Sequence, residues 1–166
     1  MLMGICSQDA VQGNMFDTVD RKKHQRLIAA LDGINERHGR NTLKWGLIPA
    51  LTKSESDAKK ISEMCLNART ETVFNLPSFY NPVLTKRCLI PATGYFEFHH
   101  RDGNSIPYYI FLKDEIIFPF CGLYEIWKSK EAENETINTF TILTVPANSL
   151  CTKIYNGGKN SGRIIW

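Results

Sequence analysis

The chain has 166 residues, of which 43% are hydrophobic and 22% are charged, as in ordinary globular proteins. Its net charge of +3 is too small to demonstrate a nucleic-acid partner, although basic residues gathered on one face would be compatible with one. No apolar run approaches the roughly 20 residues that span a bilayer, and the short apolar start lacks the basic leader of a secretory signal. We therefore expect a cytoplasmic protein without membrane association.

The cysteines stand singly and are odd in number, and none forms a CxxC pair. This pattern indicates neither a zinc site nor a disulfide framework. We expect a reduced protein with no metal and no cofactor.

The first predicted element is an amphipathic helix within residues 17–39. Leu27, Ile28, Leu31 and Ile34 recur at helical spacing and form one apolar stripe, and Gly39 ends the pattern. The opposite face is basic, and a solvated surface is the preferred interpretation of it.

After Asn41 the predicted elements change in character. Residues 43–50 read as a buried strand with a turn, and residues 54–66 as a helix capped by Ser54. Candidate strands then follow at 87–91, 95–99, 107–112, 116–124 and 139–145, with a hairpin turn at Asp102-Gly103, a polar loop at 128–138 and a short helix at 146–154. The prediction is an α+β monomer with a mainly antiparallel sheet, curled or closed into a partial β-barrel, and a few helices.

Glu97 is the first candidate for chemistry. It lies among Tyr95, Phe96 and Phe98, which would partly desolvate its carboxyl and raise its pKa, as a general acid–base group requires. The alternative is a structural glutamate at the rim of an edge strand.

A second candidate group could bind an anionic ligand. Asn67 and Arg69 lie two residues apart, so in an extended segment their side chains point the same way and could hold a phosphate or sugar oxygen. Trp45, before a Gly-Leu-Ile-Pro turn, could stack on a base or belong to the core. The Gly-rich stretch 156–163 could wrap an anion with its amides or form a flexible tail.

Seven motifs occur in a fixed order along residues 43–163. Together they resemble the SOS response-associated peptidase (SRAP) family, the abasic-site processing proteins. The motifs are WGLIP (45–49), NARTET (67–72), PSF (77–79), RCLIP with GYFE (87–97), PYY (107–109), GLY with Trp127 (122–127), and FTILT with Ala147-Asn148 (140–148).

The resemblance implies binding of single-stranded DNA at abasic sites in the DNA damage (SOS) response. In the family, a cysteine exposed after removal of the initiator Met captures the opened sugar as a thiazolidine, a covalent DNA–protein crosslink. Proton transfer, and the self-cleavage behind the peptidase (hydrolase) name, are implied for Glu97. The resemblance further implies that Asn67 lines the pocket, that Arg69 holds phosphate, and that Trp45, Thr144 and Arg163 lie in the DNA-binding region.

Two positions depart from the family pattern. Cys6 is the first cysteine but follows five residues rather than the initiator Met alone. Tyr155 stands where the family has a histidine that assists ring opening, and an unperturbed tyrosine is a poor proton shuttle because its pKa is about 10. We therefore expect the family's lyase-like crosslinking chemistry to be impaired.

Residues 1–44 resemble the C-terminal tail of UmuC-type translesion polymerases. In that tail, a Gln-x-x-aliphatic-Phe segment docks on the sliding clamp, and Gln12, Met15 and Phe16 match it. The predicted organisation is a polymerase-tail-like segment (1–44) followed by a truncated SRAP-like domain (45–166). The alternative function is a non-catalytic adaptor that binds the sliding clamp.

Overall fold

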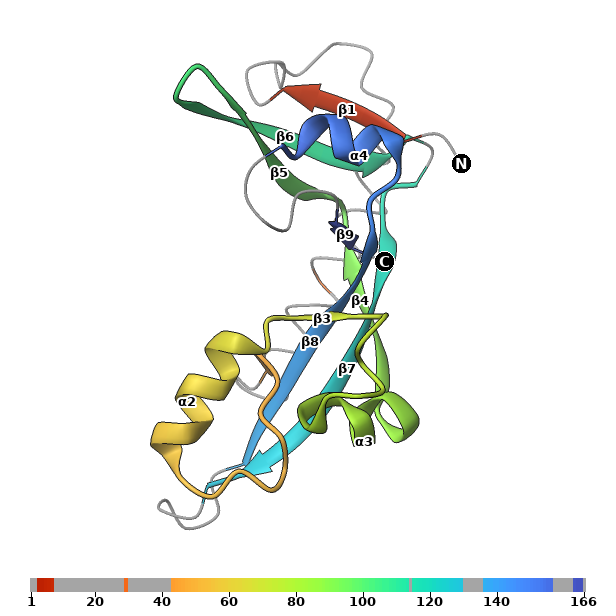
Figure 1. Cartoon of the computed structure of the whole chain (residues 1–166). Coiled ribbons are helices and arrows are strands. Elements are labelled where there is room, and N and C mark those ends of the chain that lie inside the picture. Colours follow the sequence, from red (N-terminus) through yellow and green to blue (C-terminus); the bar gives the residue numbers. More distant parts are fainter. Residues whose placement is uncertain are drawn as a thin grey trace. The chain divides into compact units, whose positions relative to one another are not determined.

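The computed structural model describes residues 3–7, 29, 43–113, 115–129, 136–156 and 163–165. The chain divides into two compact units (Figure 1). Unit 1 comprises residues 1–33, 91–119 and 146–164, and unit 2 comprises residues 34–90, 120–145 and 165–166.

Unit 1 is built on a three-stranded antiparallel sheet in the order β1-β6-β5. Its strands are β1 (Met3–Ser7), β5 (Tyr95–Arg101) and β6 (Asn104–Leu112). Asp102 (φ 50°) and Gly103 (φ 77°) both adopt the left-handed conformation between β5 and β6. Two such residues form the tight turn that matches the twist of a hairpin, which confirms the turn predicted at Asp102-Gly103.

The helix of unit 1 is α4 (Ser149–Ile154), shorter than the predicted helix at 146–154. The Asn148 side chain caps it by accepting hydrogen bonds from the amides of Leu150 (3.1 Å) and Cys151 (2.9 Å). Its buried residues Cys151 and Ile154 pack with Ile110 of β6, so the helix covers one face of the sheet.

Unit 2 holds most of a six-stranded sheet in the order β2-β8-β7-β4, with β3 and β9 also pairing with β8. The strands are β2 (Leu43–Trp45), β3 (Asn67–Arg69), β4 (Arg87–Ala92), β7 (Phe118–Lys128), β8 (Thr136–Pro146) and β9 (Arg163–Ile165). β2 and β3 both run parallel to β8, one after the other along it. The sheet is therefore mixed, although the fold is α+β as predicted.

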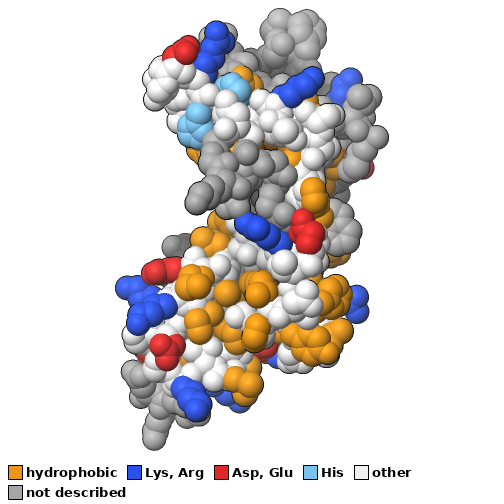
Figure 2. All heavy atoms as spheres, viewed as in Figure 1, with side chains coloured by type: hydrophobic (Ala, Val, Ile, Leu, Met, Phe, Trp, Pro, Cys, Tyr) orange, Lys and Arg blue, Asp and Glu red, His pale blue; other side chains and the backbone are white. Residues whose placement is uncertain are grey.

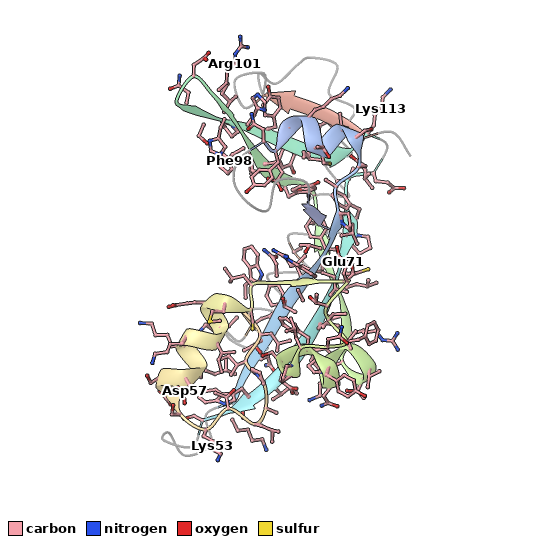
Figure 3. The ribbon with its side chains drawn as sticks, in the orientation of Figure 1. Lys53, Asp57, Glu71, Phe98, Arg101 and Lys113 are labelled. Atoms are coloured by element: carbon pink, nitrogen blue, oxygen red, sulfur yellow. The ribbon has the colours of Figure 1, made fainter. Side chains whose placement is uncertain are left out.

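Two helices cover one face of this sheet. α2 (Glu55–Met64) begins where predicted, because the Ser54 hydroxyl accepts a hydrogen bond from the Asp57 amide (3.1 Å). Asp57, in the first turn of this helix, is labelled in Figure 3. α3 (Pro77–Thr85) was not predicted. The helices and the strands enclose a core of buried residues: Leu47, Cys65, Ala68, Val73, Phe79, Val83, Leu123 and Leu143.

An ion pair between the half-buried Lys86 and the buried Glu125 links the end of α3 to β7. Glu125 is 2% exposed, forms an ion pair with Lys86, and also accepts a hydrogen bond from the Ile126 amide (2.9 Å). The Lys86 carbonyl accepts a further hydrogen bond from the Tyr124 amide (2.9 Å). Because a buried carboxylate is stable only when its oxygens are bonded, these contacts fix where the helix docks.

Other predicted elements differ from the structure or lie beyond it. β8 begins at Thr136, inside the predicted loop at 128–138, because its first residues pair with the end of β7. The predicted helix at 17–39 lies outside the described residues, apart from the helical residue Ala29. Among the residues that the structure describes, none of the helices combines the length and the apolar character needed to cross a bilayer.

Candidate functional site

In unit 2, the sheet gathers three of the predicted site residues on one face. Trp45, Asn67 and Arg69 pair in register with Phe140, Ile142 and Thr144 of β8. These partners are alternate residues of one strand, and alternate residues point to the same face. Ala68, between the two polar residues, is 1% exposed and packs in the core on the helix-covered face. The tryptophan, the amide and the guanidinium therefore form a row on the other face.

Trp45 is held in place but is not a core residue. Its ring stacks against that of Phe140, with centroids 6.4 Å apart and planes 10° from parallel. Its indole Nε1 donates a hydrogen bond to the Leu66 carbonyl (2.7 Å), and 47% of the residue remains exposed. Of the two alternatives, this geometry favours a stacking surface over a core position.

The backbone beneath Asn67 and Arg69 is fixed by several hydrogen bonds. The Arg69 carbonyl accepts from the amides of Thr72 (3.1 Å) and Val73 (2.9 Å), and the Thr70 amide donates to the Thr144 carbonyl (3.1 Å). Asn67 and Arg69 are exposed. A rigid backbone with exposed donors suits the binding of an anion, because little ordering is required when the ligand arrives.

Thr144 is placed differently from the other predicted contacts. It is 8% exposed, and its hydroxyl donates to the Ala68 carbonyl (3.4 Å). Its side chain thus links β8 to the strand that carries Asn67 and Arg69. We infer that Thr144 positions β3.

Glu97 lies in unit 1, on a face of β5 that it shares with Tyr95 and His99. All three residues are half-buried, whereas the intervening Phe96 and Phe98 are 52% and 45% exposed. Figure 3 shows Phe98 pointing away from the sheet. Glu97 is desolvated as predicted, but Phe96 and Phe98 do not share its face, because alternation along the strand turns them to the opposite face, whereas Tyr95 lies on the same face.

The predicted direction of the Glu97 pKa shift is confirmed. Burial raises the pKa of the Glu97 carboxyl, and a hydrogen bond from the Phe98 amide opposes that rise. Burial also raises the pKa of Tyr95 and of Cys151, and the charge of Glu97 raises both further. The Tyr95 hydroxyl lies 3.8 Å from the Cys151 sulfur. Glu97 thus belongs to a half-buried cluster of ionisable groups between β5 and α4.

Tyr155 and its neighbours connect the end of α4 to β5. Tyr155 is the C-cap residue, and its amide donates to the Cys151 carbonyl (2.9 Å). The Asn156 side chain accepts from the His100 amide (2.7 Å) and donates to the His100 carbonyl (2.8 Å). The ring nitrogen Nδ1 of His99 lies 2.8 Å from the Ile154 carbonyl oxygen.

His99 and Asn156 were missed by the sequence analysis. The signal for His99 was its position two residues after Glu97 on a predicted strand, which puts both on one face. Asn156 gave no comparable signal, because its partners lie 56 residues away along the chain.

Two further predicted site residues, Cys6 and Arg163, lie on strands. Cys6 lies in β1 opposite Tyr109 of β6, and Arg163 is the first residue of β9. Gln12, Met15 and Phe16, the predicted clamp-binding residues, lie outside the described residues.

Comparison with known proteins identifies relatives of the chain. The family model "SOS response associated peptidase (SRAP)" matches residues 9–157. The abasic site processing protein YoqW of Bacillus subtilis is 41% identical over 147 residues, which cover 87% of this chain and 62% of YoqW. The abasic site processing protein HMCES of Gallus gallus is 28% identical over 124 residues, covering 63% of this chain and 36% of HMCES.

Solved structures share the fold. A protein from Bacteroides thetaiotaomicron superposes with a TM-score of 0.68 at 46% identity, covering 73% of this chain and 50% of that protein. A protein from Bordetella bronchiseptica gives a TM-score of 0.64 at 28% identity, covering 73% of this chain and 57% of the other.

The extent of these matches bears on the predicted domain organisation. The chain spans about three-fifths of the length of YoqW (62%). The family match begins at residue 9 and so includes most of the segment 1–44, whose resemblance to a polymerase tail stays a prediction. Because the family model matches residues 9–157 of 166, the chain belongs to the SOS response-associated peptidase family.

Proposed function

We propose that this protein binds single-stranded DNA at abasic sites and takes part in processing them during the DNA damage response. The observation that carries the proposal is the row of Trp45, Asn67 and Arg69 along β8. Such a row offers a stacking surface for a base, an amide for a sugar or base edge and a cation for a phosphate. The names of its relatives, which are abasic site processing proteins, support the same substrate.

The proposed contacts can be tested with one substitution. We expect Arg69→Met to weaken binding to an abasic single strand about tenfold, since a hydrogen bond to a charged group contributes roughly 1.5–3 kcal/mol. The plot of log binding constant against log salt concentration has a negative slope, and its magnitude should also decrease by about 0.7, the value for one phosphate contact on a single strand. Fluorescence anisotropy at several salt concentrations measures both quantities.

A control variant separates a specific contact from a general loss of charge. Lys60 is exposed on α2, the helix that packs against the opposite face of the sheet. Lys60→Met should leave both the affinity and the salt slope nearly unchanged. Equal losses in the two variants would refute a specific role for Arg69.

We further propose that covalent capture of the abasic site is impaired in this chain. Thiazolidine formation needs a free amine and a thiol on the same residue, whereas the nitrogen of Cys6 is a peptide amide within β1. Met3, Gly4 and Ile5, which would have to be removed, pair with Leu112, Phe111 and Ile110 of β6. Exposing the amine would therefore remove most of an edge strand.

The expected result is that no crosslink survives a denaturing gel after incubation with abasic single-stranded DNA. Mass spectrometry of the purified protein shows whether the amine of Cys6 has become free. A gel-resistant adduct that persists in Cys88→Ala and disappears in Cys6→Ala would overturn the proposal and identify Cys6 as the nucleophile.

A further inference from the structure

One side of α3 carries a row of large hydrophobic side chains. Leu76, Tyr80 and Leu84 are spaced four residues apart, so they follow one ridge of the helix. The Tyr80 amide donates to the Leu76 carbonyl (2.9 Å), which places Leu76 one helical turn before Tyr80. We call these three residues the exposed stripe.

The exposed stripe is separate from the side of α3 that packs in the core. Phe79 and Val83 are 5% and 8% exposed and belong to the core of unit 2. The three residues of the stripe are 43%, 55% and 49% exposed, and Figure 2 shows hydrophobic side chains gathered where Figure 1 places α3. Single exposed hydrophobic residues are common, whereas a contiguous patch on a helix marks an interaction surface.

The surroundings of the stripe exclude a charged partner. Residues 72–85 contain no charged residue, although 22% of the chain is charged. The stripe therefore offers no cation for a DNA phosphate or an anionic lipid headgroup, and no carboxylate for a basic partner. Two identical uncharged surfaces, in contrast, can meet without repulsion, so a second copy of the chain fits the stripe.

The stripe is also symmetric about its central residue. In a two-fold dimer the same patch of both copies meets itself. A two-fold axis at Tyr80 brings the two tyrosines together and places Leu76 of each copy near Leu84 of the other, because both leucines lie four residues from Tyr80. We propose that the exposed stripe joins two copies of the chain through an antiparallel contact between their α3 helices, with the axis at Tyr80.

The size of the stripe predicts a weak dimer. A large side chain has roughly 150–250 Å² to bury, so the half-exposed stripe and its exposed neighbours Pro77, Asn81 and Thr85 would bury on the order of 500 Å² per copy. The total of about 1,000 Å² lies at the lower end for specific interfaces. The row of Trp45, Asn67 and Arg69 lies on the sheet face that α3 does not cover, so this contact leaves it free. The sequence alone predicts a monomer, but α3, which carries the stripe, was not among the predicted elements.

Sedimentation equilibrium of the full chain, from micromolar to millimolar concentration, tests the dimer. We expect a concentration-dependent dimer for the wild type. Tyr80→Arg and Tyr80→Glu should each weaken it at least about tenfold, since a tyrosine at the centre of an interface is typically a hot spot and each new charge would face its own copy. An equimolar mixture of the two variants should recover the dimer, because opposite charges then meet at the axis.

Two further variants complete the experiment. Leu51, which is 90% exposed and lies outside α3, provides the matched control, and Leu51→Arg should dimerise as the wild type does. Tyr80→Ser removes the ring without adding a charge and should also weaken the dimer. Thermal melts at low concentration should show every variant as stable as the wild-type monomer.

Each contrary result has a definite meaning. A wild type that stays monomeric at millimolar concentration overturns the proposal, and so does an equal loss of the dimer in Leu51→Arg. A mixture that stays monomeric refutes the two-fold contact at Tyr80. If all three Tyr80 variants melt well below the wild-type monomer, the stripe is covered within the chain and the proposal fails. Because no DNA is present, none of these results bears on the proposed function.

Discussion

At the scale of single residues, the candidate site residue Glu97 illustrates how burying an ionisable group lowers the stability of the folded state at high pH. Its carboxyl is half-buried, and burial raises its pKa above that of an exposed glutamate. The folded state therefore binds a proton more tightly than the unfolded state does. Stability contributed by the protonated form is present at low pH and is lost as the pH rises from the unfolded pKa, about 4.3, through the higher folded pKa.

This sign gives a prediction for Glu97→Gln. The variant cannot ionise, so its stability relative to the wild type should increase as the pH rises from about 4 and level off above the folded pKa of Glu97. Urea unfolding at a series of pH values measures the difference. A difference that does not change with pH, or that decreases, would contradict the burial of this carboxyl.

At the scale of elements, Gly46 is required where β2 ends. Its φ of +112° is unfavourable for other residues, and a Cβ atom there would lie 2.4 Å from the Ser62 carbonyl oxygen at the end of α2. Because the obstacle is backbone, relief requires that the helix or the strand move. Gly46 thus lets the strand bearing Trp45 pass close to α2.

We expect Gly46→Ala to be far more destabilising than Gly103→Ala. Gly103 is also left-handed (φ +77°), but a Cβ atom there would have no neighbour within 4 Å. Gly103→Ala should cost about 1–2 kcal/mol, the strain of the left-handed backbone alone. Gly46→Ala should exceed this by roughly 2 kcal/mol or more, as for overpacking in a core. Chemical unfolding of both variants provides the comparison, and equal losses would rule out the contact with Ser62.

Elements with a local signal were predicted from the sequence. Ser54 as a helix cap and Asp102-Gly103 as a hairpin turn specify their conformation through their own side chains or backbone, and both predictions are confirmed. α3 was missed, although Pro77 is at its first turn, because Pro82 inside the same segment reads as a helix breaker. The parallel pairing of β2 and β3 with β8 was also missed, since strand direction depends on partners about 75–95 residues away and is not encoded locally.

At the scale of the whole molecule, hydrophobic side chains remain exposed on unit 2, where Figure 2 shows a cluster of them on the visible face. Leu43, Leu51, Phe74, Tyr80 and Leu89 are each at least 55% exposed.

The candidate site was predicted only in part from the sequence. Spacing singled out Asn67, Arg69 and Glu97 as candidates, but exposure and long-range hydrogen bonds are tertiary properties, so the exposure of Trp45 and the contact of His99 with the Ile154 carbonyl required the structure.

Trp45 and Trp127, the two described tryptophans of unit 2, differ in solvent exposure, so the intrinsic fluorescence of the protein can report ligand binding. Trp127 is 2% exposed and donates to the Thr52 carbonyl, so it should emit at short wavelength and resist collisional quenchers. In a Trp166→Phe variant, which removes the tryptophan that lies outside the described residues, Trp45, half-exposed and stacked on Phe140, should supply the red, quenchable part of the emission. A nucleobase that stacks on Trp45 would quench the fluorescence of Trp45 and not that of Trp127, so ligand binding could be followed without a label.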